Sequence, residues 1–64
     1  MQIEGTKAAF DALINQKGFA KNYGYHKATV SGWKSREITL NKMEEVLKNC
    51  GALILTDTIW IITL

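Results

Sequence analysis

The chain has 64 residues, 47% of them hydrophobic, with no proline, one cysteine and a formal net charge of +2. A chain of this length buries only about 60% of the surface that its unfolded form exposes, so we expect one domain over residues 1–64 with a thin core. The single cysteine, Cys50, excludes an internal disulfide, and one histidine with one cysteine makes no ligand set for a metal. No metal and no other cofactor is therefore expected.

Neither end of the sequence indicates export or a membrane anchor. The first ten residues, MQIEGTKAAF, lack the apolar stretch and the cleavage site of a secretory signal. The most apolar run covers residues 52–64 and is interrupted by Asp57, whereas a helix that spans a membrane needs about 20 residues. We expect a cytoplasmic protein with no membrane partner, and a chain this short has no room for a separate domain that binds a small-molecule ligand.

The positive charge is concentrated in the middle of the chain. Residues 16–36 contain five cations and no acid, for a net +5, whereas the rest of the chain has three cations and six acids, for a net −3. A basic face on a slightly acidic body is typical of a surface that binds phosphate groups. A solvated lysine-rich surface has the same composition, so charge alone leaves both interpretations open.

Two short apolar patterns predict the first two helices. Thr6 is a suitable N-cap for a helix over about residues 6–16, whose apolar residues recur at helical spacing. After Lys17 and Gly18, a second and very short apolar face ends at Gly24, which suits a left-handed C-terminal cap. The two inward faces consist of Ala9, Phe10, Leu13 and Ile14, and of Phe19, Ala20 and Tyr23.

A third and a fourth helix follow. His26 or its neighbour begins a helix over about residues 27–35, in which Val30 and Trp33 point the same way. Thr39 is a good N-cap for the fourth helix. The inner side of this last helix carries Met43, Val46, Leu47 and Cys50.

After residue 51 the apolar period changes from that of a helix to that of a strand. The runs ALIL and IWIITL are rich in β-branched residues and flank a tight turn at TDT, which predicts a β-hairpin over residues 52–64. The expected fold class is therefore α+β: a small helical domain of about four helices, followed by a C-terminal β-hairpin.

The predicted hairpin is apolar on both faces. Leaving large apolar side chains in water forgoes roughly 1.5–3 kcal/mol each, so the second face needs a cover. A two-fold dimer through the hairpins supplies one, and the alternative is a monomer whose first and fourth helices wrap the hairpin. The expected dimer interface consists of Ile54, Trp60, Ile62 and Leu64.

The middle of the chain carries the residues of a helix-turn-helix. Ala20 is the small residue needed where two helices cross, Gly24 allows the tight turn, and Val30 is a branched residue that faces inward. The expected motif core is completed by Phe19, Tyr23, Tyr25 and Trp33. Residues 26–35, HKATVSGWKS, are similar to the segment S-x-S-T-V-S-x-W-K-S of the phage Cro and repressor type of helix-turn-helix protein, and the chain resembles this family over about residues 6–51.

The resemblance implies sequence-specific binding of double-stranded DNA in the major groove, by a Cro-like transcriptional repressor encoded by a phage or a bacterium. Such a homodimer would bind a palindromic operator, with half-sites about one helical turn apart, on the nucleoid. His26 departs from the family's small hydroxyl or acidic cap, and Gly32 costs its helix about 0.5–1 kcal/mol relative to alanine.

Other classes of function remain as alternatives. An antitoxin-like or other protein-binding module of the same fold would use the hairpin to hold another protein. Catalysis is not expected, because no nucleophile has a base near it in the sequence and no glycine-rich phosphate loop follows a strand.

The directions in which the side chains of the third helix point divide the expected DNA contacts into two sets. The base-contacting set on its outer face is Lys27, Ala28, Ser31 and Gly32; lysine can donate to guanine, alanine can touch a thymine methyl group, and serine can serve either kind of base. The phosphate-contacting set on the flanks and at the starts of the second and fourth helices is Gln16, Lys17, His26, Thr29, Lys34, Ser35, Arg36, Asn41 and Lys42. His26 can act as an N-cap or as a pH-dependent phosphate ligand.

Overall fold

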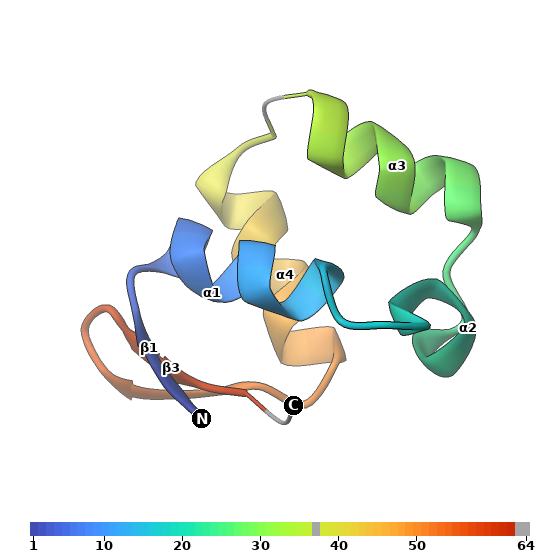
Figure 1. The fold of residues 1–64 in the computed structure, drawn as a ribbon. Helices are drawn as coiled ribbons and strands as arrows, with labels where there is room; N and C mark the ends of the chain where they lie inside the picture. Colours follow the sequence, from blue (N-terminus) through green and yellow to red (C-terminus); the bar gives the residue numbers. More distant parts are fainter. Residues whose placement is uncertain (37, 63–64) are drawn as a thin grey trace.

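The computed structural model describes residues 1–36 and 38–62, which form four helices and a three-stranded sheet (Figure 1). The helices are α1 (Thr6–Ile14), α2 (Phe19–Tyr23), α3 (Lys27–Ser35) and α4 (Leu40–Asn49). The strands are β1 (Gln2–Glu4), β2 (Leu53–Thr56) and β3 (Ile59–Ile61). The predicted α+β class, with a helical part followed by a C-terminal hairpin, is confirmed. None of the helices in the described ranges combines the length and the apolar character needed to span a membrane.

The sheet has the order β1-β3-β2, and all of its pairs are antiparallel. Trp60 in the central strand β3 lies opposite Ile3 on one side and opposite Ile54 on the other. Beyond the β1–β3 pairs, the amino group of Met1 donates to the carbonyl of Ile62 at 2.9 Å, and the Ile62 amide donates to the Met1 carbonyl at 2.9 Å. The sequence does not predict β1, because three residues with a single half-buried side chain give no periodic signal.

The core lies between α1, α4 and the inner face of the sheet. Trp60 is fully buried there, and its indole Nε1 donates to the hydroxyl of Thr6 at 3.1 Å. The buried apolar side chains are Ala9, Phe10, Leu13, Ile14, Phe19, Val30, Met43, Val46, Leu47, Ala52, Trp60 and Ile62.

Most predicted helix ends agree with the structure, and the exception is α1. His26 Nδ1 accepts from the Ala28 amide at 3.3 Å, and Thr39 Oγ1 accepts from the Lys42 amide at 3.2 Å, so both are N-caps. The predicted cap at Thr6 is wrong: Gly5, with φ of 96°, is the N-cap, and the Thr6 hydroxyl is used by Trp60. The helix also ends at Ile14, before residue 16, because the next residue, Asn15, already departs from helical geometry.

The structure corrects the predicted dimer interface. Trp60 and Ile62 are 0% and 2% exposed, because this face of the sheet packs onto the helical core, so neither can contact a partner chain. Leu64 lies outside the described residues. Ile54 remains available at 50% exposed, and its neighbours Leu53 and Leu55 are 66% and 50% exposed.

Candidate nucleic-acid interface

α3 lies at the edge of the molecule (Figure 1), and its Val30 and Trp33 side chains pack toward the core. Val30 is the one buried residue of α3. Trp33 is partly buried, and its ring centroid lies 5.8 Å from that of Phe10 in α1 and 5.1 Å from that of Tyr25. The helical spacing of Val30 and Trp33 therefore determines which side of α3 faces solvent.

Aromatic rings continue this attachment into α2. Tyr25 stacks on Phe19 with a distance of 5.6 Å between ring centroids and an interplanar angle of 11°. The ring centroids of Phe19 and Tyr23 lie 5.1 Å apart. Aromatic pairs of this kind contribute about 0.5–1.5 kcal/mol beyond the area they bury. Phe19 and Val30 are buried as predicted for the motif core, and Ala20, Tyr25 and Trp33 are half-buried. The prediction of an inward Tyr23 is wrong, since this side chain is 36% exposed at the end of the series.

The turn between α2 and α3 has the predicted geometry. Gly24 ends α2 with φ of 76°, in the left-handed region that favours glycine. Burial raises the pKa of the Tyr25 hydroxyl, and the neighbouring Cys50 thiol at the end of α4 raises it further. Tyr25 in the turn and Cys50 at the end of α4 both pack against the hydrophobic core.

Small side chains line the side of α3 that faces away from Val30 and Trp33. This row, which we call the crest, consists of Ala28, Ser31, Gly32 and Ser35. Ser35 Oγ donates back to the carbonyl of Ser31 at 3.1 Å, so its hydroxyl stays close to the helix. A crest without long side chains lets another surface come close to the backbone of α3.

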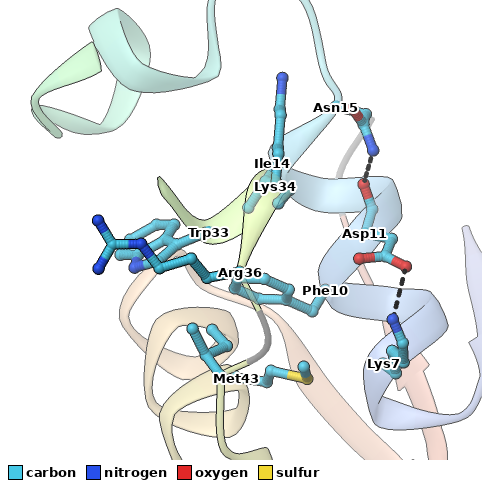
Figure 2. Close-up of a pocket in the computed structure, with 10 residues that line it drawn as sticks. Lys7, Phe10, Asp11, Ile14, Asn15, Trp33, Lys34, Arg36 and Met43 are labelled. Carbon is cyan, nitrogen blue, oxygen red and sulfur yellow. Dashed lines mark hydrogen bonds and ion pairs between the residues drawn. The ribbon is translucent and has the colours of Figure 1, made fainter. Parts of the chain in front are cut away.

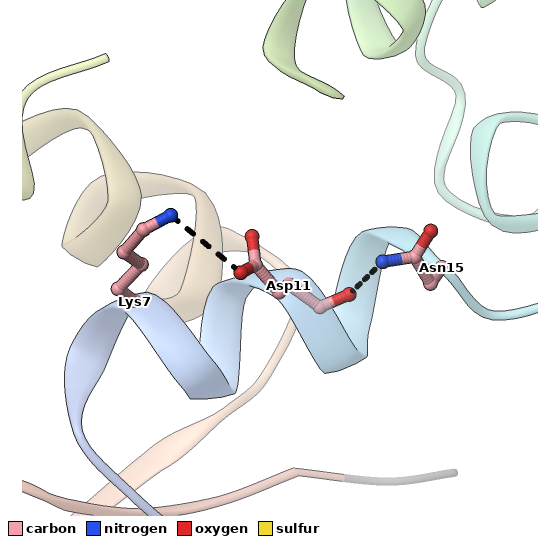
Figure 3. A network of polar contacts seen from close by, with 3 residues as sticks. All are labelled: Lys7, Asp11 and Asn15. Atoms are coloured by element: carbon pink, nitrogen blue, oxygen red, sulfur yellow. Dashed lines mark hydrogen bonds and ion pairs between the residues drawn. The ribbon is translucent and has the colours of Figure 1, made fainter. Parts of the chain in front are cut away.

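Cations border the crest on both sides. Lys27 and Lys34 lie on the side that faces α2, and Arg36 lies on the side that faces Ile38. Lys17 and Lys21 add two more exposed cations in and just before α2. Among the described residues, the ion pairs join Lys7 to Asp11 at 3.8 Å (Figure 3) and Lys42 to Glu45 at 3.5 Å, so none of these five cations is paired with a described acid.

Three hollows around α3 are formed by residues in the described ranges. The one on the α2 side has a volume of about 430 Å³ and includes Lys21, Lys27, Ser31 and Lys34 among its lining residues. The one on the Ile38 side has a volume of about 390 Å³ and is lined by Ala28, Thr29, Gly32, Trp33, Arg36 and Ile38. A third, of about 320 Å³, lies between the end of α3, α1 and α4, with Trp33 and Arg36 on one side and Asp11 on the other (Figure 2).

The structure brings most of the predicted DNA contacts to one surface. Lys27, Ala28, Ser31 and Gly32 lie on or beside the crest, with Thr29, Lys34, Ser35 and Arg36 around them, and Lys17 precedes α2. Gln16 is half-buried at the α2-side hollow, while His26 is engaged as the N-cap of α3. Asn41 and Lys42 lie in the first turn of α4, where the ion pair with Glu45 partly offsets the charge of Lys42.

Sequence reasoning left Lys21 out of the DNA contacts. It lines the same hollow as Lys27 and Lys34, which places three cations around one depression, none of them paired with an acid in the described ranges. The sequence shows the charge of Lys21. The direction in which Lys21 points depends on how α2 packs through its buried residue Phe19.

The residues of this surface can form ion pairs and hydrogen bonds with an anionic partner. Within residues 1–36 and 38–62, no group of three or more His, Cys, Asp or Glu side chains is placed to hold a metal ion. Comparisons with protein-family models, with curated proteins and with solved structures found no match to this chain. The function is therefore inferred from the residues of this surface.

Proposed function

We propose that this protein binds double-stranded DNA sequence-specifically with α3 in the major groove, and that it acts in the cytoplasm as a homodimeric transcriptional repressor. The observation that carries the proposal is the exposed side of α3, where a crest of small side chains is bordered on both sides by cations that form no ion pair with a described acid. The major groove admits an α-helix and is flanked by two phosphate backbones. The lysines on the α2 side and Arg36 on the Ile38 side match the two backbones, and the small crest matches the space between them.

Roles within the surface follow from position. Lys27, at the beginning of α3, donates to guanine O6 or N7, Ala28 contacts a thymine methyl group, and the Ser31 hydroxyl bonds to a base edge. Lys17 and Lys34 contact phosphates and contribute to affinity for every sequence. Because few side chains are long enough to reach bases, one copy of the domain has modest specificity.

A second copy of the chain supplies the remaining specificity, and strand β2 supports this part of the proposal. β2 lies at the edge of the sheet, and its three apolar side chains Leu53, Ile54 and Leu55 are each at least half exposed. An edge strand carries unpaired N–H and C=O groups, and this one contains no lysine or proline to discourage pairing. Antiparallel pairing of β2 with β2 of another chain places two α3 helices about a two-fold axis.

Selection of bound sequences from a random pool of DNA, at two salt concentrations, tests the proposal. We expect a palindromic consensus, with half-sites about one helical turn apart, and an affinity that falls as salt rises. Failure to enrich any sequence would reject sequence-specific binding, and a consensus without symmetry would reject the dimer.

A protein-binding module of the same fold is the second candidate, and the exposed apolar side chains of β2 favour it. In this case β2 pairs with a strand of a different protein, in the way an antitoxin holds its toxin. The mass of the purified protein distinguishes the two candidates. A homodimer favours the repressor, whereas a polydisperse protein that becomes monodisperse only with a partner favours the module.

A further inference from the structure

Gly32 is a glycine that the folded chain does not require. It lies inside α3, where glycine destabilises a helix relative to alanine. The glycines with positive φ are Gly5, Gly18, Gly24 and Gly51, so the backbone conformation at Gly32 does not require glycine. A Cβ atom built on Gly32 would have no side chain or neighbouring element within 4 Å, so packing within the described chain does not exclude one either.

The space in front of Gly32 is the hollow of about 390 Å³ on the Ile38 side of α3. Its walls differ in chemistry: Trp33 and Ile38 are apolar and half-buried, whereas Thr29 and Arg36 are exposed at the rim. The Arg36 guanidinium lies near the Trp33 ring (Figure 2) and forms no ion pair with a described acid. The hollow therefore offers an apolar surface next to a guanidinium group and a hydroxyl.

We propose that this hollow is a subsite for one sugar-phosphate unit of the DNA strand on the Ile38 side of α3, an assignment that rests on the proposed DNA binding. The carbon face of the deoxyribose packs against Trp33 across the gap at Gly32, and the adjacent phosphate accepts hydrogen bonds from Arg36 and Thr29. Lys27 and Lys34 lie on the opposite side of the crest and serve the other strand. Gly32 is thus a positioning residue for the backbone, in place of a reader of bases.

The Gly32→Ala variant tests this assignment because stability and binding should change in opposite directions. The added methyl group raises the helix propensity of α3, so we expect the melting temperature to rise by roughly 2–8 °C. The same methyl group occupies the gap, so affinity for the selected operator should fall about tenfold. Asn22→Ala is the matched control: it raises helix propensity in α2, outside the hollow, and should stabilise the protein with DNA affinity unchanged.

Operators with a single neutral methylphosphonate identify the phosphate involved. At one position of each half-site, the neutral group should lower the DNA affinity of the wild type. The same substitution should lower the affinity of the Arg36→Ala and Gly32→Ala variants much less, because they already lack this contact. Wild-type protein that selects no operator overturns the proposed function and the subsite together. If the wild type binds an operator, the subsite alone is overturned by unchanged affinity of Gly32→Ala, by a lowered melting temperature, or by equal sensitivity of all three proteins at every phosphate.

Discussion

The α1–α4 half of the molecule and the α2–α3 unit bury their side chains to very different extents. α1 buries four side chains and α4 buries three, whereas α2 and α3 bury one each. Most of the hydrophobic stabilisation is therefore located between α1, α4 and the sheet. α3 is oriented by Val30 and by the aromatic contacts of Trp33, which leaves its outer face free of any role in packing.

This difference means that stability and binding can be altered separately. Substitutions in the α1–α4 half should act on folding, and substitutions on the crest of α3 or its flanks should act on binding. Strand β2 is the exception, since it belongs to the sheet but exposes its apolar side chains. The following changes test how sharp the division is, from the largest expected effect to the smallest.

The two tryptophans give the largest contrast. Trp60→Ala removes a fully buried ring and its hydrogen bond to Thr6, and should cost about 3–5 kcal/mol of unfolding free energy. Trp33→Ala removes a half-buried ring and should cost roughly 1–3 kcal/mol. Urea unfolding followed by circular dichroism measures both; equal losses would show that α3 is as much a part of the core as the sheet.

A charge on β2 should separate assembly from folding. Ile54→Lys places a cation on the exposed edge strand, where it discourages strand pairing but should change the stability of one chain by no more than about 0.5 kcal/mol. We expect light scattering to show a monomer, with loss of tenfold or more in affinity for a two-half-site operator. A variant that stays dimeric would place the dimer contact elsewhere.

The lysines around α3 should differ in what they do to DNA binding. Lys27→Ala should reduce discrimination at one base pair by about 1–3 kcal/mol, whereas Lys17→Ala should weaken all sequences alike and lower the salt slope by about 1. Fluorescence anisotropy on the operator and its single-base variants measures both, with the exposed Lys48→Ala in α4 as the control. Equal loss on every sequence for Lys27→Ala would remove Lys27 from the base-reading set.

Alkaline pH should weaken the packing of Tyr25, in the turn before α3, beside Cys50 at the end of α4. Burial raises the pKa of Cys50 above its ordinary value of 9.0 and that of Tyr25 above 10.0. The folded state holds both protons more tightly than the unfolded state. The stabilisation that comes from the protonated groups is therefore complete below about pH 9, and it is lost as pH rises through the pKa values of the folded state. Urea unfolding at pH 7 and above pH 10 should show a small loss of stability, reduced in Cys50→Ala; equal losses in both proteins would contradict the role of Cys50.

Much of the helical part was predictable because it depends on local chemistry. The third helix spans residues 27–35 as expected, His26 and Thr39 act as N-caps, and Gly24 adopts a left-handed φ. Each of these features is decided by side chains within four residues of the backbone groups they contact. The outward direction of the crest follows in the same way from the spacing of Val30 and Trp33.

The sheet and the finer shape of the site depend on contacts between distant residues. Both faces of the hairpin are apolar, so the sequence pattern cannot show that Trp60 and Ile62 point inward. Thr6 is predicted to be an N-cap because its actual hydrogen-bond partner, Trp60, is far away in the sequence. The hollow beside Gly32 likewise depends on where Ile38 returns to α3. These features become visible only when the elements are placed in space.

The position of β1 has a consequence for the synthesis of the chain. Its partner β3 lies near the other end of the described residues, with Gln2 opposite Ile61 and Glu4 opposite Ile59. Because β1 pairs with β3, the sheet cannot close until β3 has left the exit tunnel of the ribosome. Until then α1 lacks its hydrogen bond between Thr6 and Trp60, and β2 has no partner strand within the chain.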